Sequence, residues 1–285
     1  MTAPTHAPPV APAGPVPVAG GIGDSPERPD GTAKVSGQFA FSSDLWHEDM
    51  LWGATARSPH PRARIRGIDI APALAVPGVH AVLTAADVPG RRTYGLERAD
   101  QPVLAFDEVR FQGEPVAVVA ADHPETARRA AAAVVVDYDV LAPVTDPEVA
   151  LDTASDPVHP GGNLVRHVPI RRGDLAAARA AAAVVVRREY EVGMQDQAFL
   201  GPESGLAVPA EDGGVDLFVA TQWLHADRDQ IAASLALDPA QVRMTLSGVG
   251  GAFGAREDIS MQLHAGLLAL RTGRPVKMVY KRNES

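Results

Sequence analysis

Runs rich in β-branched residues alternate with alanine-rich runs through most of this 285-residue chain. Val116–Ala120 is apolar throughout and predicts a buried strand, whereas Arg64–Ile70 alternates apolar and polar side chains, as a half-buried strand does. Alanine favours helices and β-branched residues favour strands, so each run can be assigned to one element type. Because helices and strands mix without a strict strand–helix–strand alternation, the pattern predicts an α+β fold.

The same reasoning places the other elements. Further strands are predicted at Leu51–Arg57, Val79–Leu83, Val134–Val140, Val184–Val192, Ser204–Val208, Val215–Val219, Gln241–Leu246 and Val276–Tyr280. Helices are predicted to about Ala133 with Asp122 as the capping residue, at Leu175–Ala183, at about His225–Leu235 and at Glu257–Leu270. Proline in the first turn supports the first helix, and Gly273 followed by Pro275 ends the last one.

The chain divides into three parts by composition. Residues 1–29 hold eight prolines with few large apolar side chains, which predicts a disordered leader. A stretch rich in proline and glycine with little periodicity, Leu141–Gly162, marks a connection between domains. The predicted domains are therefore residues 30–150 and residues 151–285.

Composition excludes several classes of protein. The net charge of −9 without a basic run argues against nucleic-acid binding. The absence of cysteine excludes thiol nucleophiles, disulfides and iron–sulfur clusters held by this chain. No window approaches the roughly 18 apolar residues of a membrane helix, and the first 27 residues carry no Lys or Arg of a secretory signal. A soluble cytoplasmic protein is expected, and its nine histidines show no metal-ligand spacing.

The densest special feature is a glycine cluster between a predicted strand and a predicted helix, Gly248-Val249-Gly250-Gly251-Ala252-Phe253-Gly254. Glycine permits positive φ and close approach to the backbone, so the turn could hold an anion or an oxo group with its amides. Phe253 breaks the dinucleotide-binding spacing, and Ala255-Arg256 does not match a phosphate-binding P-loop. A tight turn without a ligand is the alternative.

Two polar side chains near this cluster are candidate site residues. Gln222 ends an apolar strand, and its amide can donate to an oxo ligand and accept from a hydroxyl. Glu257 follows the glycine cluster at the predicted start of a helix, where the helix dipole alone would favour a carboxylate. Gln195, Asp196, Gln197 and Glu203 could line the same cleft. Each of these residues also has a local explanation as a cap or a polar loop.

A series of short motifs resembles the N-terminal part of the molybdenum-binding subunit in the xanthine oxidase/aldehyde oxidase family. The resemblance runs from about Asp30 to Ser285 and is carried by order and spacing. Its motifs are Lys34-Val35-Ser36-Gly37, Arg57-Ser58-Pro59-His60-Pro61-Arg62-Ala63, Val76-Pro77-Gly78-Val79, Gly113-Glu114-Pro115-Val116-Ala117, Arg172-Gly173-Asp174, Gln195-Asp196, Thr221-Gln222 and Gly250-Gly251-Ala252-Phe253-Gly254 with Glu257.

The resemblance implies an α/β hammerhead domain followed by a truncated molybdopterin-binding domain. It implies that Gln222 bonds an oxygen on molybdenum, that Gly251, Phe253 and Gly254 present backbone to the cofactor, and that Glu257 contacts the substrate. No side chain of this chain is expected to ligate the metal directly. The implied function is xanthine dehydrogenase-type hydroxylation of purines such as hypoxanthine and xanthine with oxygen from water. Electrons would pass to Fe–S and FAD carriers on partner subunits.

The chain departs from the family pattern in two ways. The family's Gly-Lys-Glu after the turn is Ala255-Arg256-Glu257 here, which keeps a positive charge. Family subunits are about two and a half times longer, and the resemblance places the substrate-binding arginine, later pterin-binding loops and the glutamate general base beyond Ser285. We therefore expect a fragment or split gene whose isolated chain is inactive. An aldehyde oxidase-like hydroxylase and a non-catalytic assembly or scaffold fragment are the alternatives.

Overall fold

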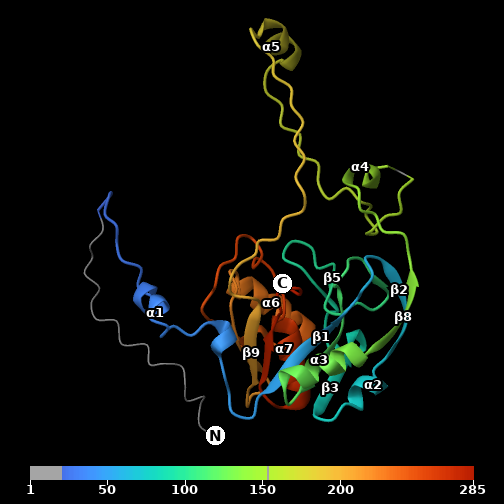
Figure 1. Ribbon diagram of the computed structural model, residues 1–285, viewed down its shortest axis with the longest axis vertical. Helices are drawn as coiled ribbons and strands as arrows, with labels where there is room; N and C mark the ends of the chain where they lie inside the picture. The colour runs from blue at the N-terminus through green and yellow to red at the C-terminus, as the bar shows by residue number, and fades with distance from the viewer. Residues whose placement is uncertain (1–20, 153) are drawn as a thin grey trace. The chain divides into compact units, whose positions relative to one another are not determined.

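The computed structural model describes residues 21–152 and 154–285, which fold as two compact units (Figure 1). The larger unit combines the described residues up to Leu141 with Gln197–Ser285, and the smaller unit is Ala142–Asp196. Residues 1–20 of the predicted leader lie outside the described residues, and residues 21–29 contain no helix or strand. The two units are treated separately below.

The larger unit contains all of the strands in the described part of the chain. They are β1 (Leu51–Arg57), β2 (Ala63–Asp69), β3 (Val79–Thr84), β4 (Thr93–Tyr94), β5 (Gln101–Pro102), β6 (Glu108–Val109), β7 (Pro115–Ala121), β8 (Val135–Val140), β9 (Ser204–Pro209), β10 (Val215–Val219), β11 (Val242–Leu246) and β12 (Val276–Val279). Its α-helices are α1 (Gly31–Val35), α2 (Ala71–Leu74), α3 (Pro124–Ala133), α6 (Leu224–Leu235) and α7 (Gln262–Thr272).

One seven-stranded sheet organises this unit, in the order β11-β10-β9-β12-β1-β7-β3. β1 runs parallel to β12 and antiparallel to β7, so strands from the two ends of the chain meet in the middle of the sheet. A three-stranded sheet, β6-β2-β8, and the short pair β4-β5 complete the unit. The sheet therefore brings the segments around β10 and β11, where the candidate site lies, onto the same framework as β1 and β7.

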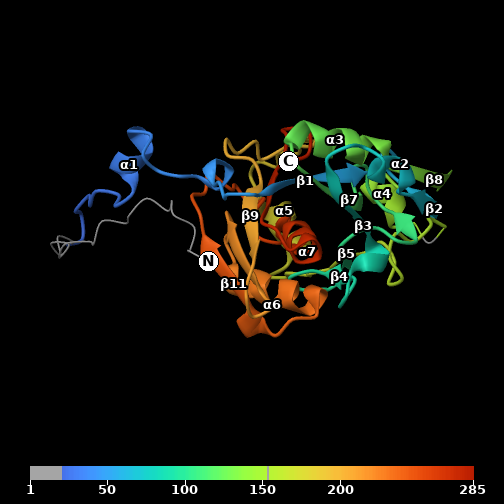
Figure 2. The same ribbon diagram turned by 90° about the horizontal axis from the view of Figure 1, so that it is seen from below.

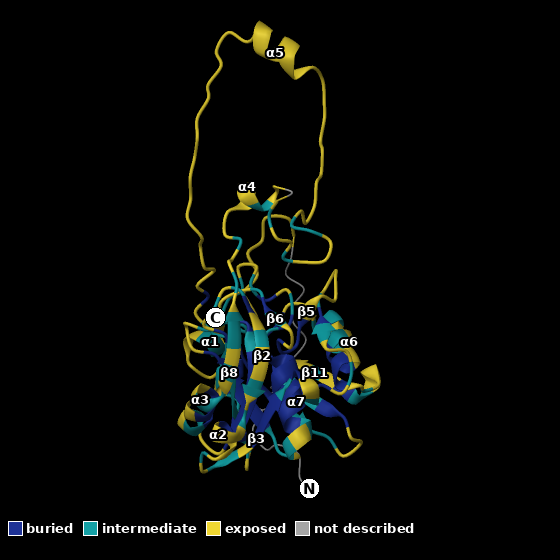
Figure 3. Cartoon of the chain, turned by 90° about the vertical axis from the view of Figure 1, so that its right-hand side faces the viewer, coloured by how far each residue is buried: buried dark blue, intermediate teal, exposed yellow. Residues whose placement is uncertain are grey.

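Each face of the large sheet supports a hydrophobic core. Because side chains alternate along a strand, Val118 and Ala120 of β7 pack into the core that includes α7, whereas Ala117 and Val119 pack into the core that includes α3. In Figure 2 the sheet curves around α7, while α3 lies on the outer side of β1 and β7. α7 is buried from Gln262 to Ala269, and Figure 3 shows it in dark blue. Most of these buried residues are apolar, as expected for a helix that is covered on several sides, and Gln262 and His264 are the polar exceptions.

The predicted α+β class and most predicted elements are confirmed. β1 and β10 have the predicted bounds, and the other predicted elements of this unit differ from the structure by a few residues at most, apart from the start of the last helix. That helix begins at Gln262, so the prediction that Glu257 lies in its first turn is wrong. The predicted Asp122 cap is also wrong. The cap of α3 is His123, whose Nδ1 accepts from the Glu125 amide at 3.2 Å, while Asp122 contacts His80 at 2.7 Å.

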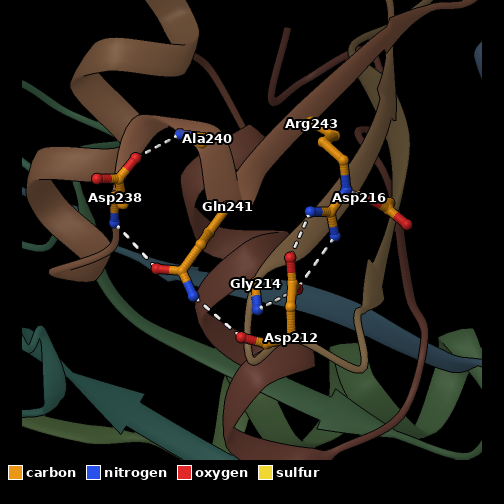
Figure 4. Close-up of polar contacts among 7 residues, drawn as sticks. All are labelled: Asp212, Gly214, Asp216, Asp238, Ala240, Gln241 and Arg243. Carbon is orange, nitrogen blue, oxygen red and sulfur yellow. Dashed lines mark hydrogen bonds and ion pairs between the residues drawn. The ribbon is translucent and has the colours of Figure 1, made fainter.

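A network of polar contacts holds the β9–β10 turn against the edge strand β11 (Figure 4). Arg243 of β11 pairs with Asp212 in the turn and with Asp216 of β10, and hydrogen bonding to Arg243 lowers the pKa of Asp212. The side-chain amide of Gln241 donates to the backbone carbonyl of Asp212 at 3.0 Å. All of these ion pairs are exposed, and charged side chains on an edge strand discourage pairing with another sheet.

The smaller unit contains two short helices, α4 (Pro147–Ala150) and α5 (Leu175–Ala181). Asp174 caps α5 by accepting from the amides of Ala176 and Ala177 at 2.9 and 3.0 Å. The predicted strand at Val184–Val192 is wrong, because these residues are extended but pair with no strand among the described residues. Figure 3 shows α5 and its flanking segments in yellow, as exposed residues. β-branched residues favour extended backbone, but a strand also needs a hydrogen-bonding neighbour.

The structure also bears on membrane insertion. Within residues 21–152 and 154–285, no helix combines the length and the apolar character needed to cross a bilayer.

Candidate functional site

The glycine-rich turn after β11 has an unusual backbone. Gly251, Phe253 and Gly254 have φ values of 106°, 52° and 93°, all in the left-handed region. For glycine this costs little, but a phenylalanine there is strained by about 1–2 kcal/mol. The Phe253 side chain is 75% exposed, and a Cβ placed on Gly254 would meet no atom within 4 Å. The turn therefore presents strained backbone toward open space.

A second backbone segment lies against the base of this turn. The Gly201 amide donates to the Gly250 carbonyl at 3.2 Å. A Cβ on Gly250 would lie 2.7 Å from both the Cα and the nitrogen of Gly201. Because the obstructing atoms belong to the backbone, no side-chain rotation can make room. Gly201 and Gly250 are therefore required by close packing of two chain segments.

We expect Gly250→Ala to destabilise the protein by about 1–3 kcal/mol, because the added methyl must push two backbone segments apart. Urea unfolding of the purified chain measures the effect. Gly67→Ala in β2 is the matched control, since its Cβ would meet nothing within 4 Å and its φ is not positive. Equal unfolding midpoints for Gly250→Ala and the parent protein would show that the two segments separate without cost.

Arg256 ties three segments around the turn together. Its side chain is buried, and it donates to the carbonyl of Gly251 at 3.0 Å, to that of Ala220 at 3.3 Å, and to that of Gly201. The guanidinium also lies over the Phe199 ring at 4.5 Å. Burial lowers the pKa of Arg256. Sequence reasoning noted only a retained positive charge here and missed this anchoring role, whose acceptors are backbone atoms far apart in the sequence.

Gln222 lies directly beside this anchor. It follows β10 and the buried residues Ala220 and Thr221, and its amide nitrogen donates to the Arg256 carbonyl at 3.2 Å. Gln222 itself is exposed, and its side-chain amide has no hydrogen-bond partner among the described residues. The backbone of Gln222 is therefore fixed next to the peptide that leads to Glu257. The side-chain amide of Gln222, which no described residue engages, is available to a ligand.

Glu257 is held in the loop before α7 by its two neighbours. Arg256 precedes it, and Asp258 follows it and accepts from the Gln230 side chain and from the Leu96 amide, each at 3.1 Å. Glu257 is exposed, and its carboxylate has no hydrogen-bond partner in the described part of the chain. The predicted helix-dipole explanation does not apply in this loop. An exposed acid between two anchored residues is instead suited to contact a ligand.

The other candidate residues lie elsewhere or serve the framework. Glu203 is buried, its carboxylate accepts from the Ser285 hydroxyl at 2.6 Å, and its carbonyl accepts from the Tyr280 amide at 2.9 Å. Gln195 and Asp196 belong to the smaller unit, which is described separately. Gln197 is exposed at the start of the returning segment. The structure therefore brings together Gln222, the Gly251–Gly254 turn and Glu257, with Arg256 as an addition.

The fold is an α+β framework that carries an exposed amide beside a strained backbone turn, and comparisons identify the family. Residues 36–142 match the family described as aldehyde oxidase and xanthine dehydrogenase, a/b hammerhead domain. Residues 158–285 match the molybdopterin cofactor-binding domain. The chain therefore belongs to the xanthine dehydrogenase and aldehyde oxidase family of molybdenum hydroxylases, with the hammerhead domain followed by part of the molybdopterin-binding domain.

Similar proteins span several named activities. A probable xanthine dehydrogenase subunit from Bacillus subtilis is 37% identical over 90% of this chain and 35% of its own length. The nicotinate dehydrogenase large molybdopterin subunit of Eubacterium barkeri is 35% identical over 93% of this chain and 62% of its own length. The crystal structure of quinoline 2-oxidoreductase from Pseudomonas putida 86 superposes with a TM-score of 0.82 at 32% identity, covering 92% of this chain and 35% of that one. The chain thus spans between about a third and two thirds of these proteins.

The cofactor of the matched domain, molybdenum bound by molybdopterin, is the predicted one, and the residues present fit it. The Gln222 amide offers a donor and an acceptor that no other described residue occupies, and a Cβ on Gly254 would meet no atom within 4 Å. Within the residues that the structure describes, no three His, Asp or Glu side chains form a metal-binding group.

Proposed function

We propose that this chain forms one wall of the active site in a xanthine dehydrogenase-type enzyme that hydroxylates purines with oxygen from water. The observation that carries the proposal is the hydrogen bond from the Gln222 amide to the Arg256 carbonyl at 3.2 Å. This bond joins the peptide of Gln222 to the one that leads to Glu257, and neither side chain has a hydrogen-bond partner among the described residues. One group can then face the cofactor while the other faces the substrate.

Each residue has a separate task in this proposal. When bound, the molybdenum cofactor supplies the oxidation chemistry by delivering a water-derived oxygen to carbon and taking up two electrons. The Gln222 amide donates to an oxygen of the cofactor and orients it, and the backbone of Gly251, Phe253 and Gly254 permits its close approach. Glu257 accepts a hydrogen bond from a ring N–H of the purine, which fixes the ring in position for attack. Fe–S and FAD carriers on partner subunits would remove the electrons.

The names of the similar proteins do not agree on one substrate class, so the class is inferred from the residues of the site. Xanthine, nicotinate and quinoline are nitrogen heterocycles, whereas other similar proteins are named aldehyde oxidoreductases. Glu257 favours a purine, because an aldehyde offers no ring N–H or exocyclic donor to a carboxylate. An aldehyde oxidase-like activity is the second candidate, and a non-catalytic assembly subunit is the third.

The complex that contains this chain, isolated through a tag on it, tests the proposal by molybdenum content and xanthine oxidation. We expect stoichiometric molybdenum and turnover of xanthine in the complex, with no turnover by the chain alone. A complex without molybdenum and without turnover would favour the assembly role. Turnover of aldehydes but not of purines would favour the second candidate.

We also expect Gln222→Ala in that complex to lower kcat by roughly tenfold to a hundredfold on every substrate alike, because one charge-stabilising hydrogen bond is lost. Steady-state kinetics with a purine and an aldehyde measure it. Gln101→Ala, at an exposed glutamine of β5, is the matched control. A defect confined to purines would contradict a role for Gln222 at the cofactor.

A further inference from the structure

A buried carboxyl group lies behind the strand end that carries Gln222. Asp227 in the first turn of α6 is fully buried, and its Oδ2 accepts from the Thr221 hydroxyl at 2.6 Å. Asp227 cannot touch a ligand at the proposed site from this position. A buried carboxylate is costly unless it is hydrogen-bonded, so its presence requires an explanation beyond packing.

The Thr221 hydroxyl links this carboxyl to both sides of Gln222. Thr221 directly precedes Gln222, and the same Oγ1 accepts from the Trp223 amide at 3.3 Å. The hydroxyl donates its one proton to Asp227 and accepts from Trp223, so a single atom holds the peptide on either side of the candidate residue. The Arg256 carbonyl holds Gln222 itself through its amide. Three hydrogen bonds thus leave little freedom to the Gln222 backbone.

We propose that Asp227 is a positioning residue that fixes the orientation of Gln222 through the Thr221 hydroxyl. The effect on catalysis rests on the proposed function. The effect on the backbone of Thr221–Trp223, the segment that follows β10 and is called the strand end here, does not. A charged acceptor makes a stronger hydrogen bond than a neutral one. Ionised Asp227 therefore holds Thr221 in the arrangement of the structure, and a neutral side chain at this position loosens it.

The surroundings of Asp227 make its charge sensitive to pH. Burial raises the pKa of Asp227 to about 6, and the negative charge of Asp258 acts in the same direction. The hydrogen bond from Thr221 opposes this shift, whereas the buried Oδ1 of Asp227 has no hydrogen-bond partner among the described residues. Because the folded pKa lies above the ordinary value of 3.8, folding favours the protonated form, and the contribution of this group to stability falls as pH rises from about 4 to 6. The hydrogen bond from Thr221 is nevertheless stronger when Asp227 is ionised, so the segment at Gln222 is held more tightly above about pH 6 even though burying the charge lowers the overall stability there.

Fluorine NMR of the chain labelled with 5-fluorotryptophan tests, without cofactor, whether the charge of Asp227 controls the backbone at Gln222. Trp223 is half exposed and adjoins Gln222, and its resonance is assigned by its loss in Trp223→Phe. His225 is replaced by Gln in every sample, so that an imidazole near the probe contributes no titration. We expect the Trp223 resonance to shift with a midpoint near pH 6 and Asp227→Asn and Thr221→Val to abolish that shift.

Matched variants decide the interpretation. Thr221→Ser keeps the hydroxyl and should keep the titration, and Asp229→Asn, at an exposed carboxylate of the same helix, should leave it unchanged. A midpoint that persists in Asp227→Asn, or a resonance that does not move between pH 4 and 8, overturns the proposal. Circular dichroism establishes that each variant is folded.

Kinetics of the complex test the catalytic consequence separately. We expect Asp227→Asn to lower kcat about tenfold with KM unchanged and molybdenum retained, and Thr221→Ser to restore kcat relative to Thr221→Val. Normal kcat in Asp227→Asn, despite loss of the fluorine titration, contradicts the link to Gln222. If the complex holds no molybdenum, the proposed function fails while the fluorine result still decides whether Asp227 controls the strand end.

Discussion

Arg256→Ala is expected to lower the free energy of unfolding by about 3 kcal/mol, because three backbone carbonyls lose a charged donor at once. The carbonyls belong to Gly201, Ala220 and Gly251, which come from three separate segments. The Phe199 ring also loses the guanidinium that covers it at 4.5 Å. Alanine offers no donor to replace these contacts. Urea unfolding of the purified chain, followed by circular dichroism, measures the change.

Two further variants separate geometry from charge. Arg256→Lys keeps the charge, but an ammonium group cannot reach three carbonyls with the planar geometry of guanidinium, so an intermediate loss is expected. Arg243→Ala removes an arginine that pairs with Asp212 and Asp216 on the exposed edge strand, and no measurable shift is expected (Figure 4). Equal losses for Arg256→Ala and Arg243→Ala would contradict the anchoring role of Arg256.

Local sequence patterns were sufficient to predict most of the framework. β1 and β10 are recognisable because apolar residues predominate in each run and turn residues bound it, and α6 is predicted to within one residue. The glycine cluster was also identifiable as a special turn, since so many glycines in a short loop have few other uses. These features depend on neighbours within a few residues, which is the range over which sequence periodicity carries information.

Features that depend on distant residues were not predictable in the same way. The last helix was predicted to start at Glu257, but Asp258 bonds Gln230 and Leu96 across the fold, and the helix starts only at Gln262. Val184–Val192 has strand composition but no strand neighbour among the described residues. Likewise, the three carbonyls that Arg256 binds and the carboxyl that Thr221 binds cannot be identified from sequence spacing.

The substrate itself is best tested at Glu257. In the assembled complex, Glu257→Ala is expected to lower kcat/KM for xanthine about a hundredfold, equivalent to about 2.7 kcal/mol of transition-state stabilisation. The carboxylate is exposed, has no partner in the described part of the chain and lies between Arg256 and Asp258, which are both anchored. Its removal should therefore leave the fold intact and affect only the ligand. Steady-state kinetics with xanthine and with an aldehyde measure the effect on both substrate classes.

Comparing the two substrates separates a direct contact between Glu257 and the purine from a general role in the pocket. A purine loses a hydrogen-bond acceptor for its ring N–H when Glu257 becomes alanine, whereas an aldehyde has no such donor and should react at an almost unchanged rate. Glu211→Ala, at an exposed glutamate in the β9–β10 turn, is the matched control and should affect neither substrate. Unchanged kcat/KM for xanthine in Glu257→Ala would remove Glu257 from the site. Equal losses for both substrates would instead assign Glu257 to the cofactor pocket as a whole, and purine selectivity would then have to arise from other residues.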